Sequence, residues 1–456
     1  MIVAEDQREK GAAGGREREA GGDIWAAHPK MVEERICMKV VTLEEAMAAI
    51  GSESRVYTQG MASTPHRLLA GFAERCNQLE NMELYHLHLE GPTPWIAPAL
   101  AGRLRDISLF VGANLREAVN DGRAFYTPLF LSEVPWFLSR SLFRPHVVLL
   151  NASLPDRHGF VSLGPTLEAT LTAIAQADIV IAQINRHIPR ALGTALIHQS
   201  AITYGVLWDE PLDGSPSLPG NSVTDAIGRH VAGLIPDRAT LQMGIGRIPD
   251  AVLRQLTGHK DLGVHSEMIS DGVRVLAEQG VITGSHKKTD PGYIVATFAM
   301  GSQSLFDFID DNPVVSMRAV DYTNNTAVIR CNPRMISVNS AIEVDLTGQV
   351  VAESIGSRIV SGVGGQMDFV RGASLAEEGR SIIALPSRTG SGLPRIVASL
   401  RPGAGVTTTR NHVQYVVTEY GVAELHGRTL EQRMRQLIAV SHPEDRDALA
   451  KAARAL

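Results

Sequence analysis

The chain has 456 residues, of which 44% are hydrophobic and 20% are charged, and its formal net charge is -6. This length is too great for a single hydrophobic core, so two or three domains are expected. The slight acidity argues against a nucleic-acid partner, and no apolar run reaches the roughly 18 residues that a membrane-spanning helix needs. The three cysteines, Cys37, Cys76 and Cys331, are too far apart for a zinc ribbon and favour a reducing compartment.

Residues 1–37 are predicted to be a mostly disordered leader. They carry charges of both signs and the glycine-rich segment 11–15, and they lack the apolar core of a secretory signal. Their acidic residues are also untypical of an organelle transit peptide. We therefore expect the protein to be cytoplasmic.

Residues 38–220 are predicted to form a first α/β domain, because strand and helix patterns alternate along them. The expected strands are 55–58, 82–89, 107–111, 147–150 and 179–182, and the expected helices are 43–50, a helix opening at Pro65, and 167–177. A segment rich in Pro, Gly and Ser at 209–221 then indicates a linker.

Residues 221–456 are predicted to form a second α/β domain, because the alternation restarts after the linker. The expected helices are 222–234, 249–257, 271–279, 428–439 and 443–456, and the expected strands are 239–243, 261–265, 293–299, 314–317, 336–339 and 382–384. Two successive α/β halves of similar size suggest one fold used twice.

A glycine turn joins strand 239–243 to the helix that follows it. Gly244 and Gly246 let a bulky ligand approach the backbone, and the opening turn of the helix offers free N–H groups to a phosphate. Glu267 comes just after the next strand, where open α/β sheets place their chemistry. This pattern predicts a phosphate-bearing ligand next to a reactive carboxylate.

Two other interpretations of this segment stay open on the residues alone. Gly244-x-Gly246 followed by Glu267 about 20 residues later also fits a dinucleotide-binding fold, although Pro249 stands where the third glycine is usual. Glu267 could instead only cap the following helix.

Six segments of the second half, and two of the first, carry a family resemblance. The segments of the second half are 241–253, 265–272, 339–348, 361–370, 403–411 and 416–421, and those of the first half are 113–123 and 154–164. Together they resemble the acetyl-CoA hydrolase/transferase family of class I coenzyme A transferases, most closely its 4-hydroxybutyrate and butyryl-CoA:acetate type. The resemblance runs from about residue 40 to the end of the chain.

This resemblance implies two open, mainly parallel α/β domains with the active site between them. It implies that Glu267 forms a covalent glutamyl-CoA thioester, and that Asn339 and Glu419 position the acyl oxygen and the acceptor. Gly364 and Gly365 can supply backbone N–H groups to an oxyanion. The residues predicted to seat part of coenzyme A are Gln242, Met243, Gly244, Ile245 and Gly246.

The predicted activity moves coenzyme A from a short-chain acyl-CoA to a carboxylate acceptor by a ping-pong mechanism. A glutamate with a pKa of about 4.3 would be ionised at pH 7 and would need no general base. An acyl-CoA hydrolase, an NAD-dependent dehydrogenase and a coenzyme A-binding module are the alternatives. No metal and no cofactor beyond coenzyme A as substrate is expected, and the resemblance suggests a homodimer or higher homo-oligomer.

Several charged residues and two histidines are further candidate ligands. Arg247, Lys260, Lys287 and Lys288 are candidate phosphate partners, although the two adjacent lysines are interpreted as an ordinary solvated pair. His86 and His88 lie on one strand face without a further ligand at useful spacing. They are therefore interpreted as structural histidines and not as metal ligands.

Overall fold

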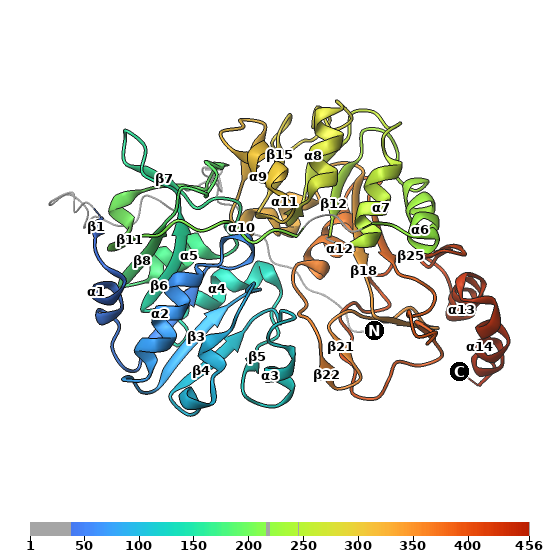
Figure 1. The fold of residues 1–456 in the computed structure, drawn as a ribbon. Helices are drawn as coiled ribbons and strands as arrows, with labels where there is room; N and C mark the ends of the chain where they lie inside the picture. Colours follow the sequence, from blue (N-terminus) through green and yellow to red (C-terminus); the bar gives the residue numbers. More distant parts are fainter. Residues whose placement is uncertain (1–37, 216–218, 245, 456) are drawn as a thin grey trace, which may run out of the picture. The chain divides into compact units, whose positions relative to one another are not determined.

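The computed structural model describes residues 38–455 apart from 216–218 and 245, and all of them belong to one compact unit (Figure 1). The predicted leader and Ile245 lie outside the described residues. Two large sheets dominate this unit, one formed by the first half of the chain and one mostly by the second half. The predicted α/β class is confirmed.

The first sheet has eight strands, and every neighbouring pair is parallel. In their order across the sheet, the strands are β1 (Lys39–Val40), β11 (Tyr204–Leu207), β8 (Ile179–Ile184), β6 (Val147–Ala152), β2 (Arg55–Thr58), β3 (Met82–His86), β4 (Leu104–Ser108) and β5 (Phe125–Tyr126). The predicted strand 55–58 is confirmed with both of its ends.

Helices cover both faces of this sheet because both faces are apolar. Val147 and Leu149 of β6 pack with α1 (Leu43–Ala48) and α2 (His66–Cys76), whereas Val148 and Leu150 pack with α4 (Val134–Leu138) and α5 (Thr170–Gln176). Successive residues of a strand point to opposite faces, so the continuous apolar run of β6 fits a buried central strand.

The second sheet has 11 strands and is also mainly parallel. Its strands are, in order, β26 (Gly421–Glu424), β25 (Tyr415–Thr418), β23 (Arg380–Ala384), β18 (Met335–Ser340), β12 (Thr240–Met243), β13 (Gly263–His265), β15 (Ile294–Ala296), β17 (Val315–Met317) and β9 (Leu192–Gly193), with β14 (Met268–Ile269) and β16 (Phe298–Ala299) beside them. Among these pairs, β26 is antiparallel to β25 and β14 is antiparallel to β12. Strand β9 comes from the first half of the chain and pairs with β17, so both halves contribute to this sheet.

The helices of the second half are α6 (Ser222–Ala232), α7 (Arg247–Gln255), α8 (Asp271–Glu278), α9 (Gln303–Ile309), α10 (Val320–Thr323), α11 (Thr326–Ile329), α12 (Gln366–Leu375), α13 (Leu430–Val440) and α14 (Arg446–Ala453). The five predicted helices, α6, α7, α8, α13 and α14, are present to within a few residues, whereas α9 to α12 were not predicted. Helix α6 begins with a capping box between Asn221 and Thr224, which explains its sharp start after the linker. Figure 1 shows α6, α7 and α8 next to one another in green and yellow, and α13 beside α14 in red.

Short elements complete the described chain. They are α3 (Arg116–Asn120), the strand pairs β7 (Phe160–Ser162) with β10 (Leu196–His198) and β21 (Ser354–Ile355) with β22 (Arg358–Ile359), the small sheet of β20 (Val350–Val351), β19 (Glu343–Asp345) and β24 (Ile396–Val397), and the 3-10 turns η2 (Met61–Ser63), η3 (Pro94–Ile96), η4 (Pro98–Leu100), η5 (Leu131–Glu133), η6 (Gln199–Ala201) and η7 (Pro443–Asp445).

The predicted strand 82–89 ends three residues early, at His86. The backbone of Met61 donates a hydrogen bond to the His88 carbonyl over 2.8 Å, and a Cβ at Gly60 would overlap that same oxygen. Residues 87–89 thus lie against residues 60–61 and not in the sheet.

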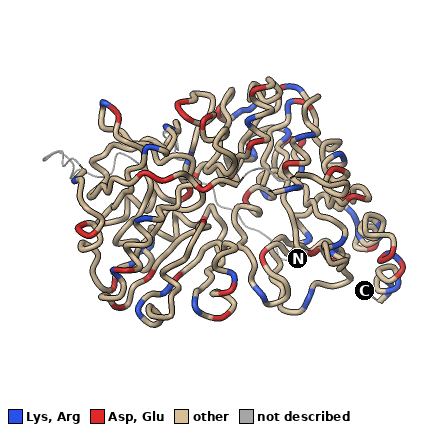
Figure 2. Tube along the Cα trace, viewed as in Figure 1, with Lys and Arg blue, Asp and Glu red and all other residues tan. Residues whose placement is uncertain are grey.

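Charges of both signs are interspersed along the described chain (Figure 2). Among the residues that the structure describes, no helix is long and apolar enough to cross a membrane.

Candidate active site

Glu267 lies in the two-residue gap between β13 and β14, at the carboxyl end of a central strand. Its backbone carbonyl accepts hydrogen bonds from Thr297 and Phe298 over 3.0 and 3.1 Å, which holds the gap against β16. The N-cap of the following helix α8 is Ser270, so Glu267 does not cap that helix. The capping interpretation is therefore wrong, and the side chain is free to point elsewhere.

The Glu267 carboxylate meets the N-terminus of α12. Asn324 donates from Nδ2 to Oε2 of Glu267 over 3.0 Å, and Gly365 is the N-cap of α12. A Cβ built at Gly365 would overlap both Oε2 of Glu267 and Nδ2 of Asn324. The free N–H groups and the dipole of a helix N-terminus favour a negative charge, so this position suits a carboxylate that must be anionic to react.

Asp368, in the first turn of α12, lies behind this contact. It accepts hydrogen bonds from Ser132 (N to Oδ2 over 3.1 Å, Oγ to Oδ1 over 2.7 Å) and from Asn324 over 3.2 Å. Because Ser132 belongs to the first half of the chain, Asp368 ties the two halves together immediately behind Glu267. Burial raises the pKa of Asp368 to about 6.

Burial also raises the pKa of Glu267, to about 7, and the negative charge of Asp368 adds to this effect. The hydrogen bonds from Asn324 and Gly365 oppose it by favouring the ionised form. The environment of Glu267 thus acts against the ionisation at pH 7 that the sequence alone predicts.

Glu267 opens into a cavity of about 300 Å³, called here the Glu267 cavity. Both halves of the chain line it, the first half with Met61, Leu87, His88, Phe110, Leu131 and Glu168, and the second half with residues that include Met268, Phe298 and Val338. A small, largely apolar cavity with a few polar groups is typical of a small-molecule site.

Most of the predicted site residues lie together here. Gln242, Met243, Gly244, Asn339, Gly364 and Gly365 all line the Glu267 cavity. The amides of Gln242 and Asn339 bond to each other over 3.2 and 3.4 Å, which fixes both side chains at the ends of β12 and β18. Gly364 has a φ of +57°, a conformation in which glycine is strongly preferred.

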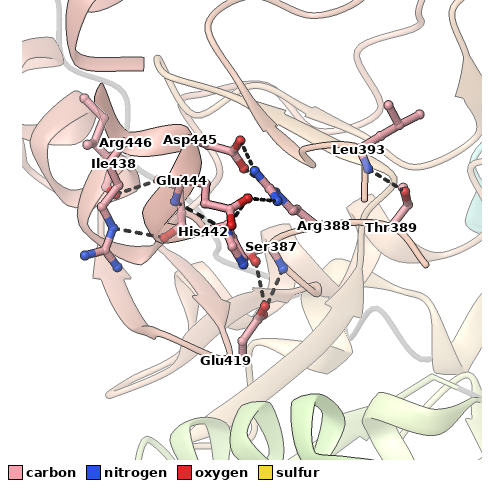
Figure 3. A network of polar contacts seen from close by, with 11 residues as sticks. Ser387, Arg388, Thr389, Leu393, Glu419, Ile438, His442, Glu444, Asp445 and Arg446 are labelled. Atoms are coloured by element: carbon pink, nitrogen blue, oxygen red, sulfur yellow. Dashed lines mark hydrogen bonds and ion pairs between the residues drawn. The ribbon is translucent and has the colours of Figure 1, made fainter. Parts of the chain in front are cut away.

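The predicted Glu419 lies elsewhere, and it does not line the Glu267 cavity. Its carboxylate accepts hydrogen bonds from the backbone N and the Oγ of Ser387 over 2.9 and 2.6 Å (Figure 3). The next residue, Arg388, pairs with Asp445 and Glu444 over 2.6 and 2.5 Å. Glu419 therefore holds the loop that follows β23.

This loop borders a second cavity of about 510 Å³, called here the neighbouring cavity, which shares Pro249 and Ser340 with the Glu267 cavity. The predicted residues Gly246 and Arg247 line the neighbouring cavity, together with Arg388 and Arg395. Arg388 is neutralised by its two acidic partners, whereas the described contacts of Arg395 are to the carbonyls of Ala341 and Ile342, over 3.1 and 3.5 Å. Arg395 thus brings positive charge to this cavity.

The other predicted cations lie away from both cavities. Lys287 is 4% exposed and donates from Nζ to the carbonyls of Val264 and Tyr293, so its interpretation as a solvated lysine is wrong. Burial lowers its pKa to about 7. Lys288 and Lys260 are exposed and line neither cavity.

The two histidines differ in their surroundings. His86 is fully buried and contacts Asp106 over 3.0 Å, which confirms its structural interpretation. His88 lines the Glu267 cavity, lies with its ring tilted against that of Phe110, and pairs with Glu90 over 2.9 Å. Its place in the cavity wall does not test the structural interpretation of His88, which stays a prediction.

The sequence matches the acetyl-CoA hydrolase/transferase N-terminal domain over residues 29–212 and the C-terminal domain over residues 301–453. The chain belongs to this family. Membership in the acetyl-CoA hydrolase/transferase family confirms the resemblance and argues against a dinucleotide-binding dehydrogenase.

Curated relatives in the acetyl-CoA hydrolase/transferase family are similar over nearly the whole chain. The 4-hydroxybutyrate coenzyme A transferase of Clostridium kluyveri is 46% identical over 91% of this chain and 97% of that protein. The succinyl-CoA:acetate/propanoyl-CoA:succinate CoA transferase of Fasciola hepatica is 45% identical over 90% of this chain and 86% of that protein.

Solved structures are also similar to this chain over most of its length. The 4-hydroxybutyrate CoA-transferase of Porphyromonas gingivalis is 37% identical with a TM-score of 0.79, covering 91% of this chain and 97% of its own. RipA from Yersinia pestis is 32% identical with a TM-score of 0.85, with the same coverage of 91% and 97%.

Proposed function

We propose that Glu267 carries coenzyme A as a covalent thioester while this enzyme moves it from a short-chain acyl-CoA to a free carboxylic acid. Coenzyme A transfer is the activity named for its similar relatives, and the chain is a coenzyme A transferase on that ground. The observation that carries the covalent mechanism is the placement of the Glu267 carboxylate at the N-terminus of α12, inside a small cavity lined by both halves.

The steps follow from the chemistry of a carboxylate and a thioester. Ionised Glu267 attacks the thioester carbonyl, the C–S bond breaks, and a mixed anhydride and a coenzyme A thiolate result. The thiolate then attacks the glutamyl carbonyl of the anhydride, which leaves a glutamyl-CoA thioester and releases the first acid as its carboxylate. The acceptor carboxylate reverses both steps, so atoms and charge balance and ping-pong kinetics follow.

Each attack produces an oxyanion that needs fixed hydrogen-bond donors. The backbone N–H groups of Gly364 and Gly365 border the cavity and can serve. The amide of Asn339 also lies in the cavity wall, but its nitrogen already donates to Gln242 and Ser337, so Asn339 would donate to the acyl oxygen only by exchanging one of these hydrogen bonds.

The neighbouring cavity suits the phosphate-bearing part of coenzyme A. Gly246 is the N-cap of α7, and Arg247 opens that helix beside Arg395. A helix N-terminus and an arginine without an acidic partner together favour an anionic phosphate. Since the two cavities share Pro249 and Ser340, a ligand seated there can extend its thiol arm toward Glu267.

The acids that fit are short aliphatic ones. A volume of about 300 Å³ shared with the arm of coenzyme A, walled by Met61, Phe110 and Phe298, leaves room for a few carbon atoms. Acetate, propionate, butyrate, 4-hydroxybutyrate and succinate are therefore the acids to examine. We also propose that the protein is a homodimer and is located in the cytoplasm. Light scattering of the purified protein tests the homodimer.

An acceptor screen tests the proposed activity. The enzyme is incubated with butyryl-CoA and each acid in turn, and the acyl-CoA products are separated by chromatography. A transferase forms acetyl-CoA when acetate is added, whereas an acyl-CoA hydrolase releases free coenzyme A at a rate that acetate does not change. A coenzyme A-binding module would leave butyryl-CoA intact.

The rate of the first half-reaction is expected to rise with pH up to about 7 and then to level off. Only ionised Glu267 is a nucleophile, and burial raises its pKa to about 7. Below that value the rate should fall about tenfold per pH unit. Stopped-flow or quench measurements of coenzyme A release across pH 5–8 check this, and a rate that stays flat down to pH 5 would contradict it.

Two substitutions behind Glu267 are expected to move this profile in opposite directions. Asn324→Ala removes a donor to the ionised form and should shift the midpoint to higher pH, whereas Asp368→Asn removes a negative charge and should shift it to lower pH. The same pH titration measures both variants. Equal shifts in one direction would indicate a general structural disturbance and not electrostatic control of Glu267.

A further inference from the structure

A second carboxyl group, Glu168, lies in the wall of the Glu267 cavity, and the mechanism above does not use it. Glu168 precedes α5 and has a φ of +46°, which is uncommon for a residue with a side chain. Its backbone N donates to Thr297 Oγ1 and its carbonyl accepts from Val320, both over 3.0 Å. Contacts with Thr297 and Val320 thus hold the strained backbone of Glu168, and such strain is common at functional sites.

The side chain of Glu168 lacks the partners that buried carboxyl groups normally have. The residue is 2% exposed, and its Oε2 has no hydrogen-bond partner among the described residues. Most buried polar side-chain atoms do have a partner, in the protein or in ordered water. An unpartnered buried oxygen at the wall of a substrate cavity therefore indicates a ligand that completes it.

Glu168 and Glu267 share this cavity but differ in the groups around them. Glu267 has the Asn324 amide and the Gly365 backbone, both of which favour its ionised form, whereas burial and the charge of Glu267 raise the pKa of Glu168 to about 8. Two neighbouring carboxyl groups in a low-dielectric site tend to share one proton. At neutral pH the proton belongs on Glu168, which leaves Glu267 as the anion.

We propose that Glu168 is a protonated acid that donates a hydrogen bond to a carboxylate oxygen of the substrate acid and so positions that acid beside Glu267. This inference rests on the proposed coenzyme A transfer. An acceptor carboxylate must enter a site that already contains acidic groups, and a neutral O–H offers it a donor where an ionised Glu168 would repel it. Glu168 is thus a positioning residue for the acid, and its own bonds do not change.

Other titratable groups face Glu168 and must be separated from it in any pH profile. They are Glu267, Asp368 behind it, His88 in the wall of the same cavity, and Tyr57 of β2. Burial holds the pKa of the Tyr57 hydroxyl above the range of an assay, and Asp368, with a pKa of about 6, is ionised above pH 7. Among these carboxyl and phenol groups, Glu168 is the one that titrates near pH 8.

Steady-state kinetics with butyryl-CoA and acetate between pH 6.5 and 9.5 test the inference on three variants. In the natural enzyme the KM for acetate should rise as the pH passes about 8, where Glu168 ionises. Glu168→Gln keeps a neutral donor, so its acetate KM should stay near the natural low-pH value at every pH. Glu168→Ala should raise the acetate KM about tenfold or more throughout, as expected for a lost hydrogen bond to a charged group, with the kcat at saturating acetate and the KM for butyryl-CoA little changed.

Glu378→Ala is the matched control, because Glu378 also has a positive φ, of +55°, but is exposed and pairs with Arg334. It should leave the acetate KM unchanged. The inference is overturned if Glu168→Ala keeps the natural acetate KM, or if Glu168→Gln loses acetate affinity as strongly as Glu168→Ala.

A measurement that needs no turnover separates this inference from the proposed function. Added acetate should raise the Tm of the natural enzyme and of Glu168→Gln at pH 7, and should raise the Tm of Glu168→Ala less at each acetate concentration. If this pattern is found without any transfer activity, the positioning role of Glu168 stands and the proposed function fails. If acetate stabilises all three proteins equally, the role of Glu168 is wrong.

Discussion

Glu267→Ala is expected to lower the rate of coenzyme A transfer by about ten-thousand-fold or more, because covalent catalysis has no substitute for a missing nucleophile. The transfer rate of Glu267→Asp should also fall steeply, since the shorter side chain holds its carboxylate about 1 Å too far from the carbonyl carbon. Transfer rates of the purified variants, measured with butyryl-CoA and acetate, check both results. A rate near that of the natural enzyme in Glu267→Ala would end the covalent mechanism.

Glu267→Gln supplies the control for folding. A buried carboxyl whose pKa is raised from 4.5 to about 7 binds its proton more tightly in the folded state, so its presence costs stability as the pH rises through this window. The glutamine variant should therefore have the same Tm as the natural enzyme near pH 4.5 and a Tm a few degrees higher at pH 8. Inactivity together with raised stability would show that the loss is chemical and not a folding defect.

Gly365→Ala is expected to lower turnover by roughly a hundredfold to a thousandfold, which is the scale for a displaced nucleophile or a lost oxyanion donor. The backbone of Gly365, with φ -94° and ψ 10°, is open to any residue, so the substitution causes no backbone strain. The added Cβ would instead overlap Glu267 Oε2 and Asn324 Nδ2. The kcat should fall far more than the affinity for acyl-CoA, because the phosphate-bearing part of the ligand binds elsewhere.

Gly258→Ala is the matched control for this prediction, since a Cβ at Gly258 would meet nothing within 4 Å. It should keep the natural kcat. Turnover of Gly365→Ala within about threefold of the natural enzyme would remove Gly365 from the catalytic machinery, given that a misplaced group normally costs far more.

The alternating strands and helices could be predicted from the sequence because they depend on local patterns. Strand β2 was predicted with both ends, and β12, α6 and α7 to within about two residues, since apolar runs, an Asn cap and glycine turns mark them. Strand β9 was missed because it is two residues long and exists only through its pairing with β17. No local pattern encodes such a distant partner.

The residues of the candidate site likewise fall into those that the sequence predicts and those that only the tertiary packing reveals. Glu267, Gly364 and Gly365 could be found because they stand in motifs of the second half. Asn324 lies outside these segments, and Asp368 lies within segment 361–370, but the contacts of both with Glu267 and Ser132 arise only from where α12 packs.

The surroundings of a side chain explain two properties that differ from the sequence-based prediction, the burial of Lys287 and the pKa of Glu267. The burial of Lys287 under residues 263–264 and 293 turns a presumed surface lysine into a structural one. The pKa of Glu267 likewise depends on burial and on Asp368, which the order of residues along the chain does not reveal.

The covalent bond between Glu267 and the sulfur of coenzyme A is most directly tested by mass spectrometry of the enzyme, quenched in acid after addition of butyryl-CoA without acceptor. We expect a mass increase equal to coenzyme A less water, located by peptide mapping on the segment that contains Glu267, and its disappearance when acetate is added before the quench. An enzyme that transfers coenzyme A while this segment stays unmodified, or that carries the adduct on another residue, would contradict the mechanism.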